Sequence, residues 1–265
     1  MSQALLRVAG LTCRFGGLLA VDGLDLVVRQ GQLAGLIGPN GAGKTTVFNL
    51  LTGRVKPTAG SVSFAGQAVL GLKSHQINRL GLARTFQNIR LFGELSVLSN
   101  VLVGFHGRLD ASFISAILRL PGYRREERRT LARAGELLEL VGLKELAGER
   151  AGNLAYGQQR LLEIARALAT EPRLLLLDEP AAGMNPQETA GLAGLVRRLR
   201  DERGLTVLLI EHDMRFVMSL CEQITVLDHG KAIAQGAPEE VQGDPAVIEA
   251  YLGAGLGAGQ EASHA

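Results

Sequence analysis

One run of eight residues constrains the fold of this chain more than any other feature. Residues 38–45 read Gly-Pro-Asn-Gly-Ala-Gly-Lys-Thr, which has the spacing of a phosphate-binding loop. An apolar run at 33–37 precedes it and is typical of a buried strand, and residues 45–51 are typical of a helix. Because the loop N–H groups and the amino end of the helix must face one phosphate, that order is required. The sequence therefore predicts an α/β fold that binds a nucleotide phosphate.

The chemistry of the loop gives its side chains different tasks. Lys44 can reach the β and γ oxygens of a nucleotide, and the Thr45 hydroxyl can ligate Mg²⁺. The residues expected to bind the nucleotide are Gly38, Pro39, Asn40, Gly41, Ala42, Gly43, Lys44, Thr45 and Thr46.

Two adjacent carboxylates supply the second element of such a site. Asp178 and Glu179 close a run of four leucines at 174–177, which has the composition of a central parallel strand buried on both faces. A carboxylate at this place can hold Mg²⁺, and its neighbour can polarise an attacking water. We therefore expect Asp178 as a metal ligand and Glu179 as the general base.

The composition excludes several classes of protein. The chain has 265 residues and a formal net charge of +2, which leaves no electrostatic basis for a dedicated nucleic-acid binder. No apolar run reaches the ~18 residues of a membrane span, and Arg7 and Arg14 interrupt any signal-like stretch near the amino end. Cys13 and Cys221 have no metal-ligand spacing and are interpreted as buried apolar residues. We expect a cytoplasmic, globular protein.

Further motifs follow in a fixed order along the chain. Gln87 ends the run Arg-Thr-Phe-Gln, Leu-Ala-Tyr-Gly-Gln occupies 154–158 before an apolar helix, His212 follows a strand, and Phe15 precedes them all. Each of these residues alone is ordinary, but their joint order is not. On these motifs the chain resembles the ATP-binding cassette (ABC) ATPases, and the resemblance covers nearly the whole sequence.

The resemblance implies an α/β architecture of the P-loop NTPase type. It implies a mostly parallel sheet, an antiparallel β subdomain and an inserted α-helical subdomain at about 95–165. We expect one ABC ATPase domain over 1–253. Residues 254–265, rich in glycine and alanine, are expected to form a disordered tail.

The resemblance also implies roles for single residues, with ATP and Mg²⁺ as cofactors. Phe15 matches the aromatic residue that stacks on adenine, and Gln87 matches a glutamine that senses Mg²⁺ and the attacking water. The expected catalytic residues are Lys44, Gln87, Glu179 and His212, and the expected metal ligands are Thr45, Gln87 and Asp178. In a head-to-tail pair of cassettes, Tyr156, Gly157 and Gln158 contact the ATP held by the partner.

Three residues depart from the commonest family pattern. Ala155 replaces a serine and Tyr156 replaces a glycine in the family's signature segment, which residues 154–158 match, and Asn185 replaces an aspartate of its D-loop, which residues 182–185 match. Contacts from the signature segment therefore depend more on the backbone of Gly157. These departures could weaken communication between the two nucleotide sites.

The same departures narrow the subfamily. The runs at 84–92, 156–160, 178–186 and 247–253 are similar to ATP-binding subunits of branched-chain amino acid importers. This implies a peripheral subunit on the cytoplasmic face of the inner membrane. Its implied partners are membrane-spanning permease subunits and a second ABC ATPase subunit, which is either a second copy or a homologous chain. A periplasmic solute-binding protein is an indirect partner, and no nucleic acid is expected. The solute is not encoded here, so a related transporter for urea, amides or lipid stays open. A soluble, non-transport cassette is disfavoured, because 44–157 contains no sustained heptads.

Overall fold

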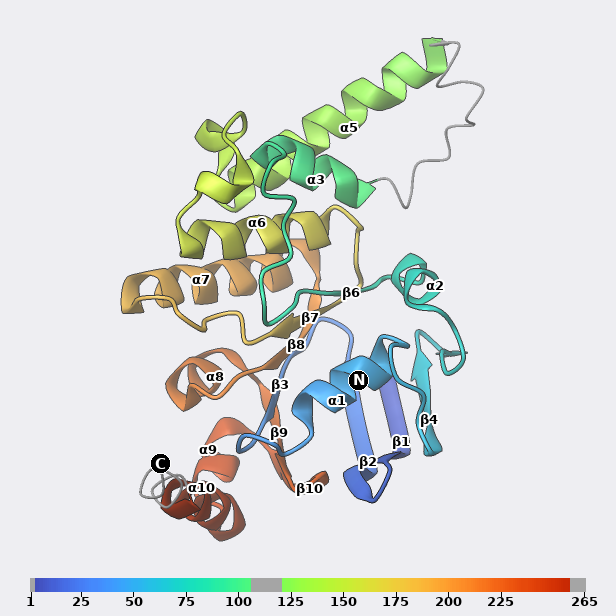
Figure 1. Cartoon of the computed structure of the whole chain (residues 1–265), viewed down its shortest axis with the longest axis vertical. Helices are drawn as coiled ribbons and strands as arrows, with labels where there is room; N and C mark the ends of the chain where they lie inside the picture. Colours follow the sequence, from blue (N-terminus) through green and yellow to red (C-terminus); the bar gives the residue numbers. More distant parts are fainter. Residues whose placement is uncertain (1–2, 106–120, 258–265) are drawn as a thin grey trace.

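The structure, a computed structural model, describes residues 3–105 and 121–257 of the chain. Figure 1 shows its layers: helices α3, α5, α6 and α7 lie on one side of a six-stranded sheet, and α1 lies with the strands of a second sheet on the other. The six-stranded sheet has the order β10-β9-β3-β8-β7-β6. Its strands are β3 (Leu33–Ile37), β6 (Leu82–Arg84), β7 (Leu174–Asp178), β8 (Thr206–Ile210), β9 (Gln223–Asp228) and β10 (Lys231–Gly236).

The central strands are parallel, and only β10 runs antiparallel, as a hairpin with β9. Because successive side chains of a strand point to opposite faces, each central strand contributes to two hydrophobic clusters. Leu175 and Leu177 pack with the helical layer, whereas Leu174 and Leu176 pack with α1 and the second sheet. Burial on both faces explains why this strand is an uninterrupted leucine run.

The second sheet is antiparallel, with the order β2-β1-β4-β5. We predicted short strands at 5–8 and 24–28, but β1 and β2 are each 12 residues long. The glycines that suggested turns lie instead at shifts of register: Gly10 in β1 and Gly23 in β2. The strands are β1 (Ala4–Phe15), β2 (Leu18–Arg29), β4 (Ala59–Phe64) and β5 (Gln67–Ala68).

Helices fill the remaining segments. Those between 95 and 168 occupy the region predicted as a helical insert, and their apolar faces share one cluster with β7 and β8. Where the inserted subdomain begins and ends stays a prediction. The helices are α1 (Lys44–Leu51), α2 (Ser74–Arg79), α3 (Val97–Phe105), α5 (Pro121–Leu140), α6 (Tyr156–Leu168), α7 (Pro186–Arg203), α8 (Met214–Leu220), α9 (Pro238–Gln242) and α10 (Pro245–Gly257), with short 3₁₀ turns at Lys144–Leu146 and Ala151–Asn153.

The carboxyl end corrects one prediction. Residues 254–257, expected to be part of a disordered tail, continue α10 as far as Gly257. Once α10 is nucleated at Pro245, with Asp244 accepting from the Ala246 N–H, each added residue gains a hydrogen bond, and this offsets the weak helix propensity of glycine. The rest of the predicted tail, 258–265, lies outside the described residues. Within residues 3–105 and 121–257, the structure has no helix with the length and apolarity of a membrane span.

Candidate nucleotide-binding and hydrolysis site

The phosphate-binding loop lies where the sequence placed it, between β3 and α1. A Cβ atom at Gly38 would lie 2.0 Å from the Leu227 carbonyl oxygen, and one at Gly43 would lie 2.3 Å from that of Ala20. Both glycines have positive φ angles, 147° and 101°. Larger side chains are therefore excluded on steric and conformational grounds, and the backbone itself lines the loop.

The first turn of α1 leaves its N–H groups available to an anion. Its N-cap is Gly43, which offers no capping side chain. Lys44 is buried, and its Nζ donates to the carbonyl oxygens of Gly38 at 2.7 Å and Pro39 at 2.8 Å. Burial lowers the pKa of Lys44, and the nearby carboxylates Glu179 and Asp178 oppose that shift. A cation and a set of free backbone donors thus face the same loop.

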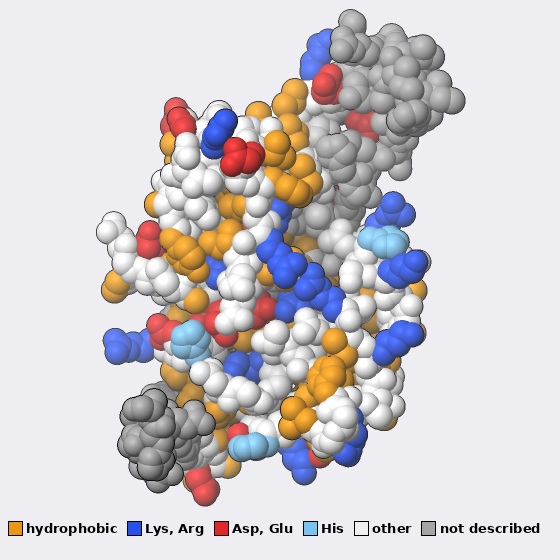
Figure 2. Space-filling model, in the orientation of Figure 1, with side chains coloured by type: hydrophobic (Ala, Val, Ile, Leu, Met, Phe, Trp, Pro, Cys, Tyr) orange, Lys and Arg blue, Asp and Glu red, His pale blue; other side chains and the backbone are white. Residues whose placement is uncertain are grey.

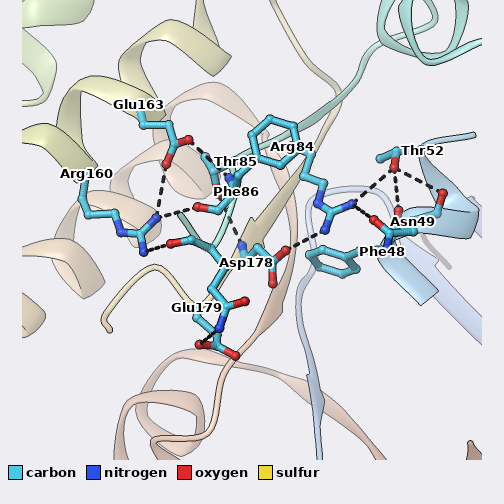
Figure 3. Close-up of polar contacts among 11 residues, drawn as sticks. Phe48, Asn49, Thr52, Arg84, Thr85, Phe86, Arg160, Glu163, Asp178 and Glu179 are labelled. Carbon is cyan, nitrogen blue, oxygen red and sulfur yellow. Dashed lines mark hydrogen bonds and ion pairs between the residues drawn. The ribbon is translucent and has the colours of Figure 1, made fainter. Parts of the chain in front are cut away.

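The two carboxylates lie at the end of β7, as predicted. Asp178 is 1% exposed, and its Oδ2 lies 2.7 Å from Nη2 of Arg84 on β6. Figure 3 shows this ion pair between Arg84 and Asp178 as a dashed line. Its Oδ1 is buried with no hydrogen-bond partner among the described residues. Glu179 has a φ of 47°, which is uncommon for a residue with a side chain and turns its carboxylate out of the strand.

Two predicted residues from distant segments meet at Glu179. Gln87 donates from Nε2 to Oε2 of Glu179 at 2.9 Å. Nδ1 of His212 lies 4.0 Å from the same oxygen, and the His212 side chain is 59% exposed. The sequence order of these motifs therefore converts into a spatial cluster, because the parallel strands before them end at one edge of the sheet.

Glu211, whose role was not predicted from the sequence, binds two backbone segments at this edge of the sheet. It is 1% exposed, and its two oxygens accept hydrogen bonds from the backbone N–H groups of Ala181 at 2.8 Å and His212 at 3.2 Å. Burial raises the pKa of Glu211, and these hydrogen bonds and His212 oppose the shift. One carboxylate thus links Ala181, which directly precedes the D-loop, to the segment that carries His212.

The signature segment forms the amino end of α6 and lies apart from the phosphate loop. Buried residues of α6 pack on one face of the six-stranded sheet, and those of α1 pack on the other. Tyr156 is 45% exposed, and Gln158 accepts from the Ala155 N–H through Oε1 at 3.1 Å. A Cβ atom at Gly157 would lie 2.6 Å from the carboxylate of Glu188. The segment therefore packs against α7 with one side and faces outward with the other.

Asn185, one of the departures, has a local explanation. It is the N-cap of α7, where its Oδ1 accepts from the Glu188 N–H at 2.9 Å. Its own N–H donates to Oε2 of Glu188, also at 2.9 Å. Asparagine and aspartate are equally good N-caps. The replacement therefore preserves the start of α7.

The carboxyl-terminal helix lines the outer side of the phosphate loop. A cavity there is bordered by residues 39–42 of the loop and by Ala246, Glu249 and Ala250 of α10. Burial raises the pKa of Tyr251 on the same helix, and the Gly38 backbone opposes this shift. Residues 247–253, singled out in the sequence, are thus part of the surroundings of the loop.

The position of Phe15 is consistent with its predicted role in stacking on adenine. This residue lies at the turn of the β1–β2 hairpin, paired with Leu18, and is 48% exposed. The hairpin approaches the loop through Ala20, whose carbonyl lies against Gly43. An exposed aromatic ring on a hairpin that reaches the phosphate loop is available for stacking on a base.

Comparison with known families agrees with this geometry. The sequence profile described as ABC transporter matches residues 21–182. The chain belongs to this family. A second profile, described as branched-chain amino acid ATP-binding cassette transporter, matches residues 233–256, which include most of α10. The predictions of an ABC ATPase and of an α/β fold of the P-loop type are confirmed.

Individual ABC proteins are similar over almost their full length. BraF of Pseudomonas aeruginosa, named a high-affinity branched-chain amino acid transport ATP-binding protein, is 52% identical over 96% of this chain and 99% of its own. LivG of Escherichia coli, named likewise, is 51% identical over the same shares.

Solved structures of ABC cassettes share the fold. A nucleotide-free ATP-binding cassette from an ABC transporter has a TM-score of 0.82 and 32% identity over 94% of this chain and 99% of that one. The ADP conformation of such a cassette has a TM-score of 0.83 and 32% identity over 95% and 100%. The roles of single residues in this chain stay predictions.

Proposed function

We propose that this ABC ATPase energises the import of branched-chain amino acids through separate membrane-spanning subunits. The observation that carries the ATPase assignment is the 2.9 Å hydrogen bond from Gln87 to Glu179 at the edge of the sheet that also presents Lys44 and Asp178. The solute class is supported by the 52% identity to a branched-chain amino acid transport protein over 96% of the chain.

The residues at the site fit MgATP. Gly38 and Gly43 leave room for phosphate where side chains would collide with backbone, and α1 presents its uncapped amino end. Residues 38–46 would hold the phosphates and Phe15 the adenine. Asp178 retains a buried, unpartnered Oδ1 among the described residues, so it would hold Mg²⁺ together with Thr45 and Gln87. The metal, when bound, neutralises charge on the phosphates.

Hydrolysis then requires one activated water. Glu179 accepts a proton from the water while the oxygen of that water bonds to the γ-phosphorus. The bond from the γ-phosphorus to the β–γ bridging oxygen breaks, and its electron pair stays on ADP. Gln87 holds one oxygen of the Glu179 carboxylate, and His212 lies beside it. Lys44 stabilises the negative charge on the phosphates.

A second cassette completes each site in this proposal. The signature segment and the phosphate loop pack on opposite faces of the sheet, so one chain does not bring them together. In a head-to-tail pair with a second copy or a homologous chain, Tyr156, Gly157 and Gln158 would contact the ATP of the partner.

A groove between the helical layer and α2 is the proposed docking surface for the permease. Its lining includes Arg54, Phe86, Phe92 and Arg166, and it adjoins the Gln87 segment. The guanidinium of Arg54 stacks 4.4 Å from the Phe86 ring centre. Figure 2 shows Lys and Arg side chains gathered at the middle of the drawn face. This mixed aromatic and cationic surface would receive a cytoplasmic segment of the permease. The chain would then lie on the cytoplasmic face of the inner membrane. A periplasmic solute-binding protein would communicate with it only through the permease.

Uptake by whole cells tests the proposal. Cells that lack this chain receive the wild type, Glu179→Gln, or Arg197→Lys as a surface control. Radiolabelled leucine, isoleucine, valine and urea are supplied separately. We expect uptake of the three amino acids to require the wild type or the control variant. Loss of urea uptake alone would contradict the solute class, and full amino acid uptake with Glu179→Gln would contradict the ATPase role.

A further inference from the structure

Arg160, in the first turns of α6, hydrogen-bonds the backbone of Phe86 and Gln87. Its side chain is 3% exposed. Its guanidinium donates to the carbonyl oxygen of Phe86 at 2.6 Å and to that of Gln87, and also to the hydroxyl of Tyr156 at 3.2 Å. Figure 3 shows Arg160 and Glu163 pointing from α6 toward this segment.

Glu163, one turn further along α6, also binds this backbone. Its Oε1 accepts from the Phe86 N–H at 3.3 Å, and its Oε2 lies 3.3 Å from Nη1 of Arg160. Both the N–H and the carbonyl of Phe86 are therefore bonded to one buried ion pair. Because an unpaired buried charge is costly, each partner fixes the other in place.

The two ends of this arrangement have different surroundings. At one end, the Gln87 amide donates to Glu179 at 2.9 Å. At the other end, Tyr156 is 45% exposed, and its ring lies 3.0 Å from a Cβ atom built at Gly183 of the D-loop. A continuous series of contacts thus joins an outward-facing side chain to the proposed general base.

We propose that Arg160 is a positioning residue that links Tyr156 to the Gln87 amide and so to Glu179. The nucleotide that one cassette contacts through Tyr156 then influences hydrolysis in that cassette's own site. This inference rests on the proposed function, because only the head-to-tail pair brings a partner's ATP to Tyr156. The tyrosine that replaces the family's glycine thereby strengthens a connection between sites that the sequence suggested it would weaken.

A simpler role would be to fasten α6 to the sheet. The variant Tyr156→Phe separates the two roles, because it removes one hydroxyl from a partly exposed ring and leaves the contacts of Arg160 with Phe86 and Gln87 in place. A fastening role predicts no change in hydrolysis for this variant. A link through the hydroxyl predicts a lower kcat with little change in KM.

A double-mutant cycle tests the link between residues that do not touch. The full chain is prepared as wild type, Tyr156→Phe, Gln87→Ala and the double variant, and ATP hydrolysis is measured for each. We expect Tyr156→Phe to lower kcat about fivefold and to add less than about twofold to the effect of Gln87→Ala. Effects that multiply independently would overturn the proposal. Arg197→Lys, which alters an exposed guanidinium bonded to the Ser219 carbonyl, is the matched control.

Hydrogen exchange supplies a second measurement that needs no turnover. In the full chain without nucleotide, the Phe86 N–H is expected to exchange about tenfold faster in Arg160→Lys and several-fold faster in Tyr156→Phe. The rate in Arg197→Lys should equal that of the wild type. Unchanged exchange in Tyr156→Phe would overturn the link. A wild-type chain that hydrolyses no ATP would instead contradict the proposed function, so the two failures are distinguishable.

Discussion

Arg84 and Asp178 form a buried ion pair at the carboxyl edge of the parallel sheet, with Nη2 of one 2.7 Å from Oδ2 of the other. Nη1 of the same guanidinium donates to Oδ1 of Asn49 on α1 at 2.8 Å. One cation therefore joins β6, β7 and the helix of the phosphate loop. It also occupies one oxygen of Asp178 and leaves the other for the proposed metal.

Removing this cation is expected to destabilise the chain. In Arg84→Met, Asp178 keeps a buried charge without its partner, and we expect the free energy of unfolding in urea to fall by about 3 kcal/mol. Millimolar Mg²⁺ should restore part of the loss, because a divalent cation can compensate the same carboxylate. Arg54→Met is the control, since Arg54 is exposed and also stacks on Phe86. A loss below about 1 kcal/mol in Arg84→Met would show that the pair contributes little.

Substitutions at Glu179 and Lys44 are expected to have different effects on nucleotide binding. Glu179→Gln should retain ATP binding and lower turnover by about a thousandfold or more, because the amide does not accept the proton from water. It should also favour an ATP-bound dimer, visible by size-exclusion chromatography with light scattering. Lys44→Ala should weaken ATP binding itself, as measured by calorimetry. Substantial hydrolysis by Glu179→Gln would move the general base elsewhere, and unchanged affinity in Lys44→Ala would contradict the phosphate assignment.

The sequence was sufficient for the parts of the site that lie at strand ends. The apolar run at 174–177 predicted a doubly buried strand, and parallel strands bring their carboxyl ends to one edge. The cluster of Lys44, Gln87, Asp178 and Glu179 follows from that geometry and from the order of the motifs. The predicted roles of these residues remain to be measured.

The buried arginines could not be predicted, because their partners are remote in the sequence. Arg84 bonds to a residue 94 positions away, and Arg160 bonds to Phe86 across 74 positions. In the sequence both resemble ordinary surface cations, and no local rule reveals the remote acceptors to which each one bonds. The last turn of α10 was missed for another reason: glycine and alanine at 254–257 suggested disorder, whereas the helix continues to Gly257.

Both cysteines are expected to be unreactive in the native chain. Cys13 and Cys221 are buried free thiols, and burial raises the pKa of Cys221 to about 12 and also raises that of Cys13. Alkylation by iodoacetamide at pH 8 should be at least a hundredfold slower, roughly, than for an exposed thiol. Mass spectrometry after labelling in buffer and in urea checks this. Rapid labelling of Cys221 in buffer would mean that the packing of α8 against the sheet opens readily.

Glu211 should make stability depend on pH in a direction opposite to that of a surface carboxylate in an ion pair. Burial raises the pKa of Glu211 in the folded chain, so the native state holds this proton more tightly than the unfolded state does. Its contribution to the free energy of unfolding therefore falls as the pH rises from the unfolded pKa of about 4.3 through the folded value.

Glu211→Gln isolates this contribution, because the amide does not titrate and the other carboxylates are the same in both proteins. The variant loses one of the two oxygens that accept from Ala181 and His212, which costs about 1–3 kcal/mol at acid pH. As the pH rises toward neutrality, the wild type loses stability that the variant keeps, so the difference between them should shrink. Urea unfolding at several pH values between about 4.5 and 8 measures it, with Glu202→Gln on the exposed end of α7 as the control. A difference that stays constant or widens with pH would mean that Glu211 is ionised in the folded chain without cost.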